Sequence, residues 1–294
     1  GFGEVVAYMR QHDPGHPIFI NLLPNYATPK QMEAANYEEY VTRFLDEVRP
    51  FALSYDHYHF AMNRATGQER DGEHFFPNLA IARRLAKERG IPFFQIVLVT
   101  QHFSFRNLTE GEIRFEAMQT LAYGGKGLLW FTYWHPKSQS IQWSHAMINR
   151  DGTRNPHYYM VQRVNRELLA LGKELLPAES LSVFHAGAAS IAATQKVPGG
   201  VGPRAADEMV NVVGPGEVSV GTFKRGHNEH LALVANVDYK QPLRTRVFVA
   251  SGAKEPQRFD ITTRTWQDAK SAMHAGGFLV DVELTPGGAA LLKW

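Results

Sequence analysis

The chain has 294 residues, of which 44% are hydrophobic, a net charge of +2 and no cysteine. That size predicts one large domain, alone or with a smaller one, around a substantial core. The small net charge without a long basic run gives no indication of nucleic-acid binding. The absence of cysteine excludes disulfides and thiolate metal sites, and no apolar run is long enough to span a membrane.

The first ten residues have the pattern of an amphipathic helix, with Phe2, Val5, Val6 and Met9 on one face. The chain shows neither an initiating methionine nor a signal peptide. We therefore expect it to be the C-terminal portion of a longer protein. The lack of cysteine fits an exported bacterial protein, and we expect a secreted or periplasmic location.

Four apolar stretches alternate with helical patterns over residues 1–178. The predicted strands are 17–24, 51–56, 92–99 and 127–134, and the predicted helices are 29–48, 76–89, 110–123 and 156–176. Strands that are apolar almost throughout are typical of a parallel sheet buried on both faces. Each strand ends in polar and aromatic residues, which indicates a (β/α) barrel with one functional face. The alternative is an open doubly wound sheet, although no Gly-rich phosphate-binding motif follows any strand.

The pattern changes from about residue 181. Stretches 230–238, 244–250 and 278–284 have strand lengths and are separated by turn residues at 226–228, Gly252 and 286–288. A further turn signal at Pro198-Gly199-Gly200 predicts a flexible loop. We therefore predict an α/β chain with a (β/α) TIM-type barrel portion at 1–178, followed by an antiparallel β-sandwich at 181–294. Residues 63–74 are predicted to form a polar loop. Gly90 is predicted to cap the C-terminal end of the helix 76–89.

The strand that begins at Phe51 ends in a cluster of carboxylate, imidazole and phenol groups. Leu53 and Tyr55 alternate with Ser54 and Asp56, so the two pairs lie on opposite faces of the strand. The first pair is expected to face the surrounding helices and the second the barrel interior. A carboxylate at the carboxyl end of a barrel strand lies where this architecture has its chemistry. Asp56 is therefore the predicted catalytic residue.

These segments resemble the C-terminal half of clan A-type glycoside hydrolases, especially β-galactosidase-like proteins near family 42. The resemblance is carried by residues 13–24, 53–58, 121–134, 151–152, 165–168 and 284–294. It implies that the four strands are strands five to eight of a (β/α)8 barrel. It also implies that the acid/base glutamate of strand four lies upstream of Gly1. In the clan a nucleophilic glutamate ends strand seven, where this chain has Thr100, Gln101 and His102.

Glycoside hydrolysis usually needs two carboxylates that flank the scissile bond. Asp56 is the candidate to replace the missing strand-seven nucleophile, and its partner is expected upstream. Asp71, Glu73, Glu110 and Glu112 are weaker candidates, and the last two fit the first turn of a helix, where acidic residues are common.

The remaining candidate site residues lie at or just beyond the predicted strand ends, where aromatic and amide groups suit a sugar-binding cleft. The expected substrate-binding residues are Asn21, Tyr26, Tyr58, His57, Gln101, His102, Tyr133 and Trp134, with Trp134 as the floor of a subsite. A zinc site made by His57 and His59 with His102 or His135 is an alternative. We predict no bound metal and no cofactor.

The function predicted from the sequence is hydrolysis of a polysaccharide or oligosaccharide by a carboxylate pair. A non-catalytic carbohydrate-binding relative and a metal-dependent hydrolase are the alternatives. The expected partners are a carbohydrate substrate and either the upstream half of the same protein or a second copy that completes the barrel. Neither nucleic acid nor a membrane is expected as a partner.

Overall fold

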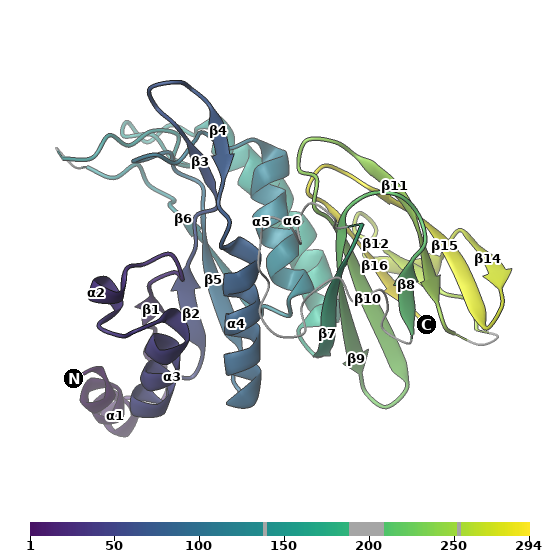
Figure 1. Cartoon of the computed structure of the whole chain (residues 1–294), viewed down its shortest axis with the longest axis horizontal. Helices are drawn as coiled ribbons and strands as arrows, with labels where there is room; N and C mark the ends of the chain where they lie inside the picture. Colours follow the sequence, from purple (N-terminus) through teal and green to yellow (C-terminus); the bar gives the residue numbers. More distant parts are fainter. Residues whose placement is uncertain (138–139, 188–208, 252–253) are drawn as a thin grey trace.

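The structure is a computed structural model that describes residues 1–137, 140–187, 209–251 and 254–294. An N-terminal part of alternating helices and parallel strands is followed by a C-terminal part of antiparallel strands (Figure 1). The turns predicted at Pro198-Gly199-Gly200 and at Gly252 lie outside the described residues.

The N-terminal part contains one four-stranded parallel sheet in the order β1-β2-β5-β6. Its strands are β1 (Asn21–Leu22), β2 (Leu53–Asp56), β5 (Phe93–Leu98) and β6 (Gly127–Phe131). All four predicted strands are therefore present and parallel. The first is much shorter than the predicted 17–24, and prolines at both ends of that stretch lack the N–H group that a ladder needs.

Helices precede and follow these strands as the sequence pattern predicts, with one correction. They are α1 (Phe2–His12), α2 (Pro29–Met32), α3 (Tyr37–Val48), α4 (Phe75–Glu88), α5 (Glu110–Ala122) and α6 (Pro156–Leu175). The predicted helix 29–48 is in fact two helices. Glu33, with φ of 51°, ends α2 in the left-handed region. The Asn36 side chain accepts a hydrogen bond from the Glu39 N–H and starts α3.

The predicted polar loop 63–74 was only partly right, because half of it belongs to a β-hairpin. Strands β3 (Phe60–Met62) and β4 (Glu69–Asp71) pair antiparallel. At the hairpin end, Asn63 Oδ1 accepts a hydrogen bond of 3.0 Å from the Ala65 N–H. Gly67 adopts φ of 71°, which glycine tolerates without strain.

The two faces of the parallel sheet have different surroundings. Leu53, Tyr55 and Phe93 are buried in a core shared with α3, α4 and α5. On the opposite face Phe94 contacts the ring of Phe19, with 6.4 Å between centroids. Phe19 remains 42% exposed and Leu129 of β6 37% exposed. The sheet thus has a helix-covered face and a half-exposed face that is apolar over most of its length.

The C-terminal part consists of two antiparallel sheets, in the orders β13-β12-β16-β10-β9-β7 and β14-β15-β11-β8. The strands are β7 (Glu179–Ala186), β8 (Val210–Val212), β9 (Val218–Arg225), β10 (Glu229–Asn236), β11 (Leu243–Val249), β12 (Gln257–Asp260), β13 (Thr265–Asp268), β14 (Ser271–His274), β15 (Gly277–Leu284) and β16 (Ala289–Lys293). The stretches predicted at 230–238, 244–250 and 278–284 coincide with β10, β11 and β15. Both sheets contribute to one core, for example through Val234 and Val280.

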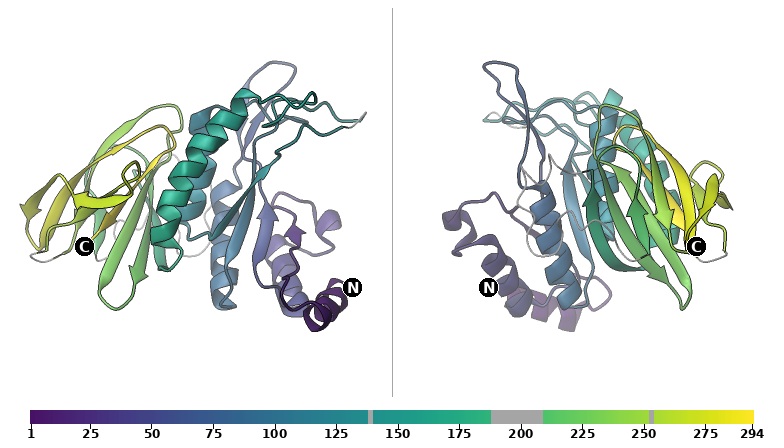
Figure 2. Two further views of the ribbon diagram at one scale, coloured as in Figure 1. Left: turned by 180° about the vertical axis from the view of Figure 1, so that it is seen from behind. Right: turned by 45° about the vertical axis from the view of Figure 1, so that its right-hand side comes forward.

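Helices α5 and α6 lie between the parallel sheet and the six-stranded sheet (Figure 2). Met118 and Leu171 from the helices form a core with Phe223 and Leu233 of the six-stranded sheet. The parallel sheet therefore packs against the C-terminal part through two helices rather than directly.

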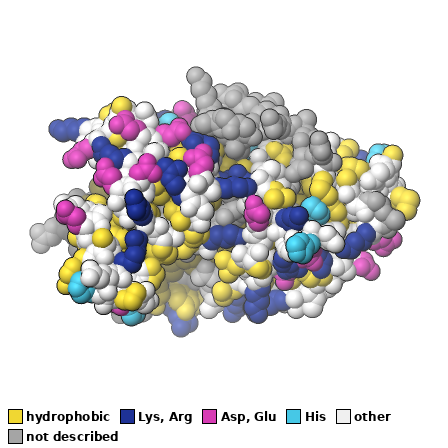
Figure 3. All heavy atoms as spheres, turned by 90° about the horizontal axis from the view of Figure 1, so that it is seen from below, with side chains coloured by type: hydrophobic (Ala, Val, Ile, Leu, Met, Phe, Trp, Pro, Cys, Tyr) yellow, Lys and Arg dark blue, Asp and Glu magenta, His cyan; other side chains and the backbone are white. Residues whose placement is uncertain are grey.

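The surface carries both signs of charge among hydrophobic side chains, as the face seen from below shows (Figure 3). That mixture agrees with the net charge of +2. None of the helices in the described parts of the chain combines the length and the apolar composition that crossing a membrane requires.

Candidate active site at the strand ends

Asp56 lies at the carboxyl end of β2, on the face opposite the helices. Parallel pairing places Asn21 beside Ser54 and Asp56 beside Ile96, so these side chains share the half-exposed face. Asn21 Nδ2 donates a hydrogen bond of 2.8 Å to Asp56 Oδ1, and the Ser54 hydroxyl donates to Asn21 Oδ1 at 3.2 Å. The orientation of Asp56 predicted from strand alternation is therefore confirmed.

The electrostatic environment of Asp56 contains two opposing effects. Partial burial raises the pKa of Asp56 above its ordinary value, because burial disfavours the charged form. The Asn21 amide donates to the carboxylate and opposes that rise in pKa. Asp56 thus combines a perturbed titration with a fixed orientation, which is typical of residues at functional sites.

Tyr26, His57 and Tyr58 surround the end of β2, but they point in different directions. The Tyr58 N–H donates to the Tyr26 hydroxyl at 3.4 Å, which ties the loop after β1 to β2. Tyr26 is 41% exposed, whereas His57 is buried and its Nδ1 lies 2.9 Å from Asn78 Oδ1. Burial lowers the pKa of His57 to about 3, so the ring is neutral at ordinary pH. His57 therefore lies on the helix-covered side of the strand end, against Asn78 of α4, which differs from its predicted contact with substrate.

Tyr58 connects the end of β2 to the ends of β5 and β6. Its ring packs edge-on against His102, at 5.6 Å between centroids, and stacks on Phe131 at 5.6 Å. Burial and the nearby Asp56 carboxylate raise the pKa of the Tyr58 phenol, which stays protonated. The ends of β1, β2, β5 and β6 therefore meet on one rim, as they must when parallel strands end at the same edge of a sheet.

At the end of β5, Gln101 and His102 are both held by the loop that follows β6. Gln101 pairs with Ser144 through two backbone hydrogen bonds, and the Ser144 hydroxyl donates to Gln101 Oε1 at 2.6 Å. His102 is buried, its Nδ1 lies 2.8 Å from the Thr100 carbonyl oxygen, and its ring stacks on Trp143 at 4.5 Å. Burial lowers the pKa of His102, so it too is a neutral group. The hydrogen bond to Oε1 fixes the orientation of the Gln101 side chain and thereby the position of its amide nitrogen.

A pocket of about 780 Å³ opens beside Gln101. Sequence analysis did not identify most of its wall, which includes Arg64 of the hairpin turn and Trp143 and Arg150 of the loop after β6. Arg150 Nε lies 3.2 Å from His135 Nδ1 and is held there. His135, considered from the sequence only as a possible zinc ligand, also lines it, and the tryptophan inside a polar loop is a signal that could have pointed to this wall. Asp56 is not among the residues that line this pocket.

Tyr133 and Trp134 do not lie at this pocket, although both are exposed, at 57% and 46%. Tyr133 lines a separate groove of about 570 Å³ between β6 and α6, together with Leu129 and Tyr158. Trp134 pairs with Ile148 through a bridge that anchors the loop after β6. The aromatic residue that lines the pocket beside Gln101 is Trp143, and Trp134 is not among its lining residues. A role of Trp134 as the floor of a subsite stays a prediction.

The other carboxylates considered from the sequence have ion-pair partners. Asp71 and Glu112 both contact Arg106, and Glu110 contacts Arg114 and Arg163. Glu73 lies 3.8 Å from Arg70 on the surface. Glu112 caps α5 in a reciprocal arrangement with Thr109, as expected for an acidic residue in a first turn.

The histidines considered as zinc ligands occupy separate environments. His57 contacts Asn78, while His102 stacks on Trp143. Within the described ranges, no group of three or more metal-ligating side chains converges.

Solved structures with a similar fold are glycoside hydrolases. A catalytic mutant of a GH42 β-galactosidase from G. stearothermophilus matches with a TM-score of 0.53 at 9% identity, over 98% of this chain and 65% of that one. A rhamnosidase from Novosphingobium sp. PP1Y matches with a TM-score of 0.44 at 8% identity, over 84% and 35%. A family 51 α-L-arabinofuranosidase from Bifidobacterium longum matches with a TM-score of 0.39 at 11% identity, over 99% and 61%. The chain spans less than two-thirds of the length of each of these three structures.

The match to the GH42 β-galactosidase structure shows the class of the fold, an α/β fold shared with TIM-barrel glycoside hydrolases. No curated protein matches the chain. The family model described as β-galactosidase, for glycoside hydrolase family 42, matches residues 2–171. The chain therefore belongs to the β-galactosidase family of glycoside hydrolases, as its sequence resemblance predicts.

Proposed function

We propose that this chain forms part of a glycosidase that cleaves a polysaccharide or oligosaccharide with a carboxylate pair, of which Asp56 is one member. The observation that carries the proposal is the placement of Asp56 at the carboxyl end of β2, on the half-exposed face of the sheet, where the Asn21 amide donates a hydrogen bond to it. Barrel enzymes have their chemistry at this edge of the sheet. Membership of the β-galactosidase family supports the reaction class.

The four parallel strands are proposed to be strands five to eight of an eight-stranded barrel. Residues 1–178 then belong to the barrel and 181–294 to a C-terminal β-sandwich. The partner that completes the barrel is the upstream half of the protein or a second copy. The half-exposed apolar face and the two open edges, at β1 and β6, support this proposal. A secreted or periplasmic location remains part of the proposal.

In the proposed mechanism Asp56 attacks the anomeric carbon, and a second carboxylic acid from the upstream half protonates the leaving oxygen. The bond between Asp56 and the sugar forms as the bond to the leaving sugar breaks. Water, deprotonated by the second carboxylate, then releases the sugar and restores Asp56. Asn21 orients the Asp56 carboxylate, and the Gln101 amide and Trp143 bind hydroxyl groups and a sugar face in the adjacent pocket.

A non-catalytic carbohydrate-binding protein is the second candidate. It is favoured by one observation, that Thr100, Gln101 and His102 end β5 without a carboxylate. Such a protein would retain the rim and the pocket but would lack turnover.

The test uses the protein that includes both barrel halves, assayed on a panel of nitrophenyl glycosides and glycans. Asp56→Asn is expected to lower kcat on the order of 10⁴-fold, as the loss of the catalytic carboxylate does in a serine protease. The matched control is Asp13→Asn, which removes an exposed carboxylate at the end of α1. Added formate should restore part of the rate of Asp56→Ala, because it supplies the missing carboxylate. Full turnover by Asp56→Asn would disprove the assignment, and no turnover by the unmodified protein would favour the second candidate.

A further inference from the structure

The pocket beside Gln101 is lined by positive charge. Arg64 of the hairpin turn and Arg150 of the loop after β6 both belong to its wall, and no carboxylate is among the described residues that line it. Its volume of about 780 Å³ lies within the range of small-molecule sites. A concave site lined by one sign of charge raises the local concentration of ligands of the opposite sign. The lining therefore favours a ligand that carries a negative charge.

Both guanidinium groups are accessible and lack an anionic partner. Arg64 is exposed, and within the described part of the chain no hydrogen bond or ion pair holds its side chain. Burial lowers the pKa of His102, and the charge of Arg64 lowers it further, which places that charge near the rim. Arg150 is also exposed, with its Nε 3.2 Å from His135 Nδ1 and its Nη2 3.4 Å from the Pro136 carbonyl oxygen. Neither acceptor carries a negative charge, so Arg150 is positioned but not neutralised.

Backbone hydrogen bonds hold together the segments that carry the two arginines. The Met62 N–H donates to the Ser104 carbonyl oxygen at 2.7 Å, which fixes the β3–β4 hairpin against the loop after β5. Gln101 and Ser144 exchange backbone hydrogen bonds of 2.9 and 3.0 Å, which fix the loop after β6 against the same segment. The two cations therefore approach one pocket from opposite sides of the β5 end.

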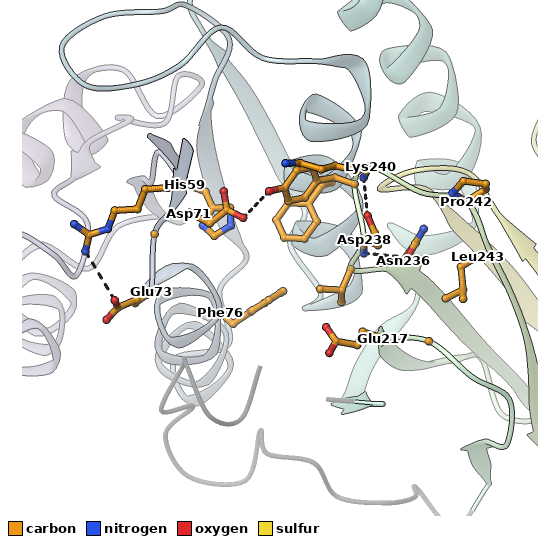
Figure 4. Close-up of a pocket in the computed structure, with 16 residues that line it drawn as sticks. His59, Asp71, Glu73, Phe76, Glu217, Asn236, Asp238, Lys240, Pro242 and Leu243 are labelled. Carbon is orange, nitrogen blue, oxygen red and sulfur yellow. Dashed lines mark hydrogen bonds and ion pairs between the residues drawn. The ribbon is translucent and has the colours of Figure 1, made fainter. Parts of the chain in front are cut away.

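The charged groups of a larger pocket, of about 1000 Å³ between the hairpin and the loop that joins β10 to β11, contact other side chains (Figure 4). Asp71 accepts a hydrogen bond of 2.6 Å from the Tyr239 hydroxyl, and Glu73 lies 3.8 Å from Arg70. These carboxylates already have partners, so that pocket indicates no class of ligand. The arginines beside Gln101 differ in this respect.

The rest of the lining beside Gln101 suits a sugar unit. Trp143 provides an aromatic surface for C–H faces, and the Gln101 amide provides donors for hydroxyl groups. The planar guanidinium of an arginine matches the two oxygens of a carboxylate, and it presents the same pair of donors to a sulfate ester. Asp56 does not line this pocket, so a unit bound here lies beside the unit that Asp56 attacks.

We propose that this pocket binds a sugar unit that carries an anionic group, a carboxylate or a sulfate ester, through Arg64 and Arg150. The substrate of the proposed glycosidase is then an acidic glycan, and the two arginines determine that specificity. The choice of a sugar rests on the proposed function, whereas the negative charge is inferred from the arginines alone. No bond is made or broken in this pocket.

Equilibrium binding to the complete protein tests the proposal, measured in Asp56→Asn so that hydrolysis does not consume the probes. The probes are oligogalacturonate with its methyl ester, and sulfated galactan oligosaccharides with their desulfated forms. In one of the two pairs the anionic member should bind about 20-fold more tightly, the effect of two exposed ion pairs. The pair that shows this preference identifies the group as a carboxylate or as a sulfate ester.

Arg64→Gln and Arg150→Gln should each weaken the anionic probe by about fivefold and leave its neutral counterpart unchanged. The matched control is Arg166→Gln, which removes an exposed arginine from the separate groove between β6 and α6 and should change neither affinity. Circular dichroism should show the same fold in all variants, because the three side chains are exposed.

Equal affinity for both members of each pair would overturn the proposal, as would the absence of binding by any probe. A preference that persists in the double variant Arg64→Gln/Arg150→Gln would place the anionic group elsewhere and overturn it too. Hydrolysis by Asp56→Asn at the unmodified rate would count against the catalytic role of Asp56 and not against the charge preference. The two proposals can therefore fail separately.

Discussion

Arg106 connects three segments that are far apart in the sequence, and its removal makes the sharpest test of how they pack. The guanidinium is buried and donates to the Ala61 carbonyl oxygen at 3.2 Å and to Asp71 Oδ1 at 3.0 Å. Its Nε donates to Glu112 Oε1 at 2.8 Å, and its Nη2 donates to the Tyr239 hydroxyl at 3.2 Å. The hairpin, α5 and the loop between β10 and β11 are thus tied to one cation.

Arg106→Met is expected to lower the free energy of unfolding by about 3–5 kcal/mol, the cost of leaving a buried charge without its partner. The cost arises at Glu112, whose side chain is only 3% exposed. Glu112 keeps its hydrogen bond of 2.6 Å from the Thr109 N–H but loses its cation. Asp71 is 38% exposed and can be rehydrated, so it adds little.

Arg114→Met is the matched control, because Arg114 lies on α5, the helix that contains Glu112, and also pairs with two carboxylates. Its partners Glu110 and Glu167 are 27% and 23% exposed, so water can replace the cation, and the expected loss is about 1–2 kcal/mol. Urea unfolding followed by circular dichroism measures both variants. The double variant Arg106→Met/Glu112→Gln should recover part of the loss. Equal losses in Arg106→Met and Arg114→Met would refute the reasoning about the buried charge.

Two further predictions concern the rim and the half-exposed face of the parallel sheet. Asn21→Ala removes the amide that opposes the raised pKa of Asp56, so that pKa rises further. If Asp56 reacts in its ionised form, the acid limb of kcat/KM moves to higher pH; an unchanged limb, or one at lower pH, would argue against the contact. The chain by itself should self-associate, because Phe19 and Leu129 are exposed beside open strand edges. Sedimentation velocity that shows a stable monodisperse monomer at all concentrations would contradict the half-barrel hypothesis.

The parallel sheet and the placement of Asp56 could be predicted because both follow from local alternation. Leu53 and Tyr55 are buried against helices and Ser54 and Asp56 lie on the other face, as a period of two requires. The start of α6 was equally predictable, since the Asn155 side chain caps it and Pro156 occupies its first turn. These features depend on a few neighbouring residues.

Features that depend on contacts between distant segments were not predictable. The β3–β4 hairpin contains the exposed, charged strand Glu69–Asp71, which has no apolar alternation and is held by Arg106 from 35 residues further on. Trp143 reaches the pocket because Ser144 pairs with Gln101 across 43 residues. Trp134 ends a predicted apolar strand and was singled out for that reason, whereas Trp143 lies in a loop without such a pattern. Strand-end position alone does not show which way a loop then turns.

Glu116 is a second carboxyl group near the strand ends, and it differs from Asp56 in its surroundings. It is fully buried on α5, and burial raises its pKa well above the ordinary value. The ladder between β2 and β5 ends where the His57 N–H meets the Ile96 carbonyl oxygen. Beyond that point the backbone groups of Leu98 and His59 interact with the Glu116 carboxyl and oppose the rise in its pKa.

Neither carboxyl oxygen of Glu116 has a hydrogen-bond partner of ordinary geometry among the described residues, and the side chain is enclosed by the protein. Helix α5 packs on the helix-covered face of the parallel sheet. Glu116 therefore has no access to a sugar on the half-exposed face, and its role is structural. Asp56 differs in the face on which it lies, since its carboxylate projects to the half-exposed side and is oriented there by Asn21. Two carboxyl groups with raised pKa values thus lie near the end of β2, and only Asp56 lies on the side of the sheet where we propose that the sugar binds.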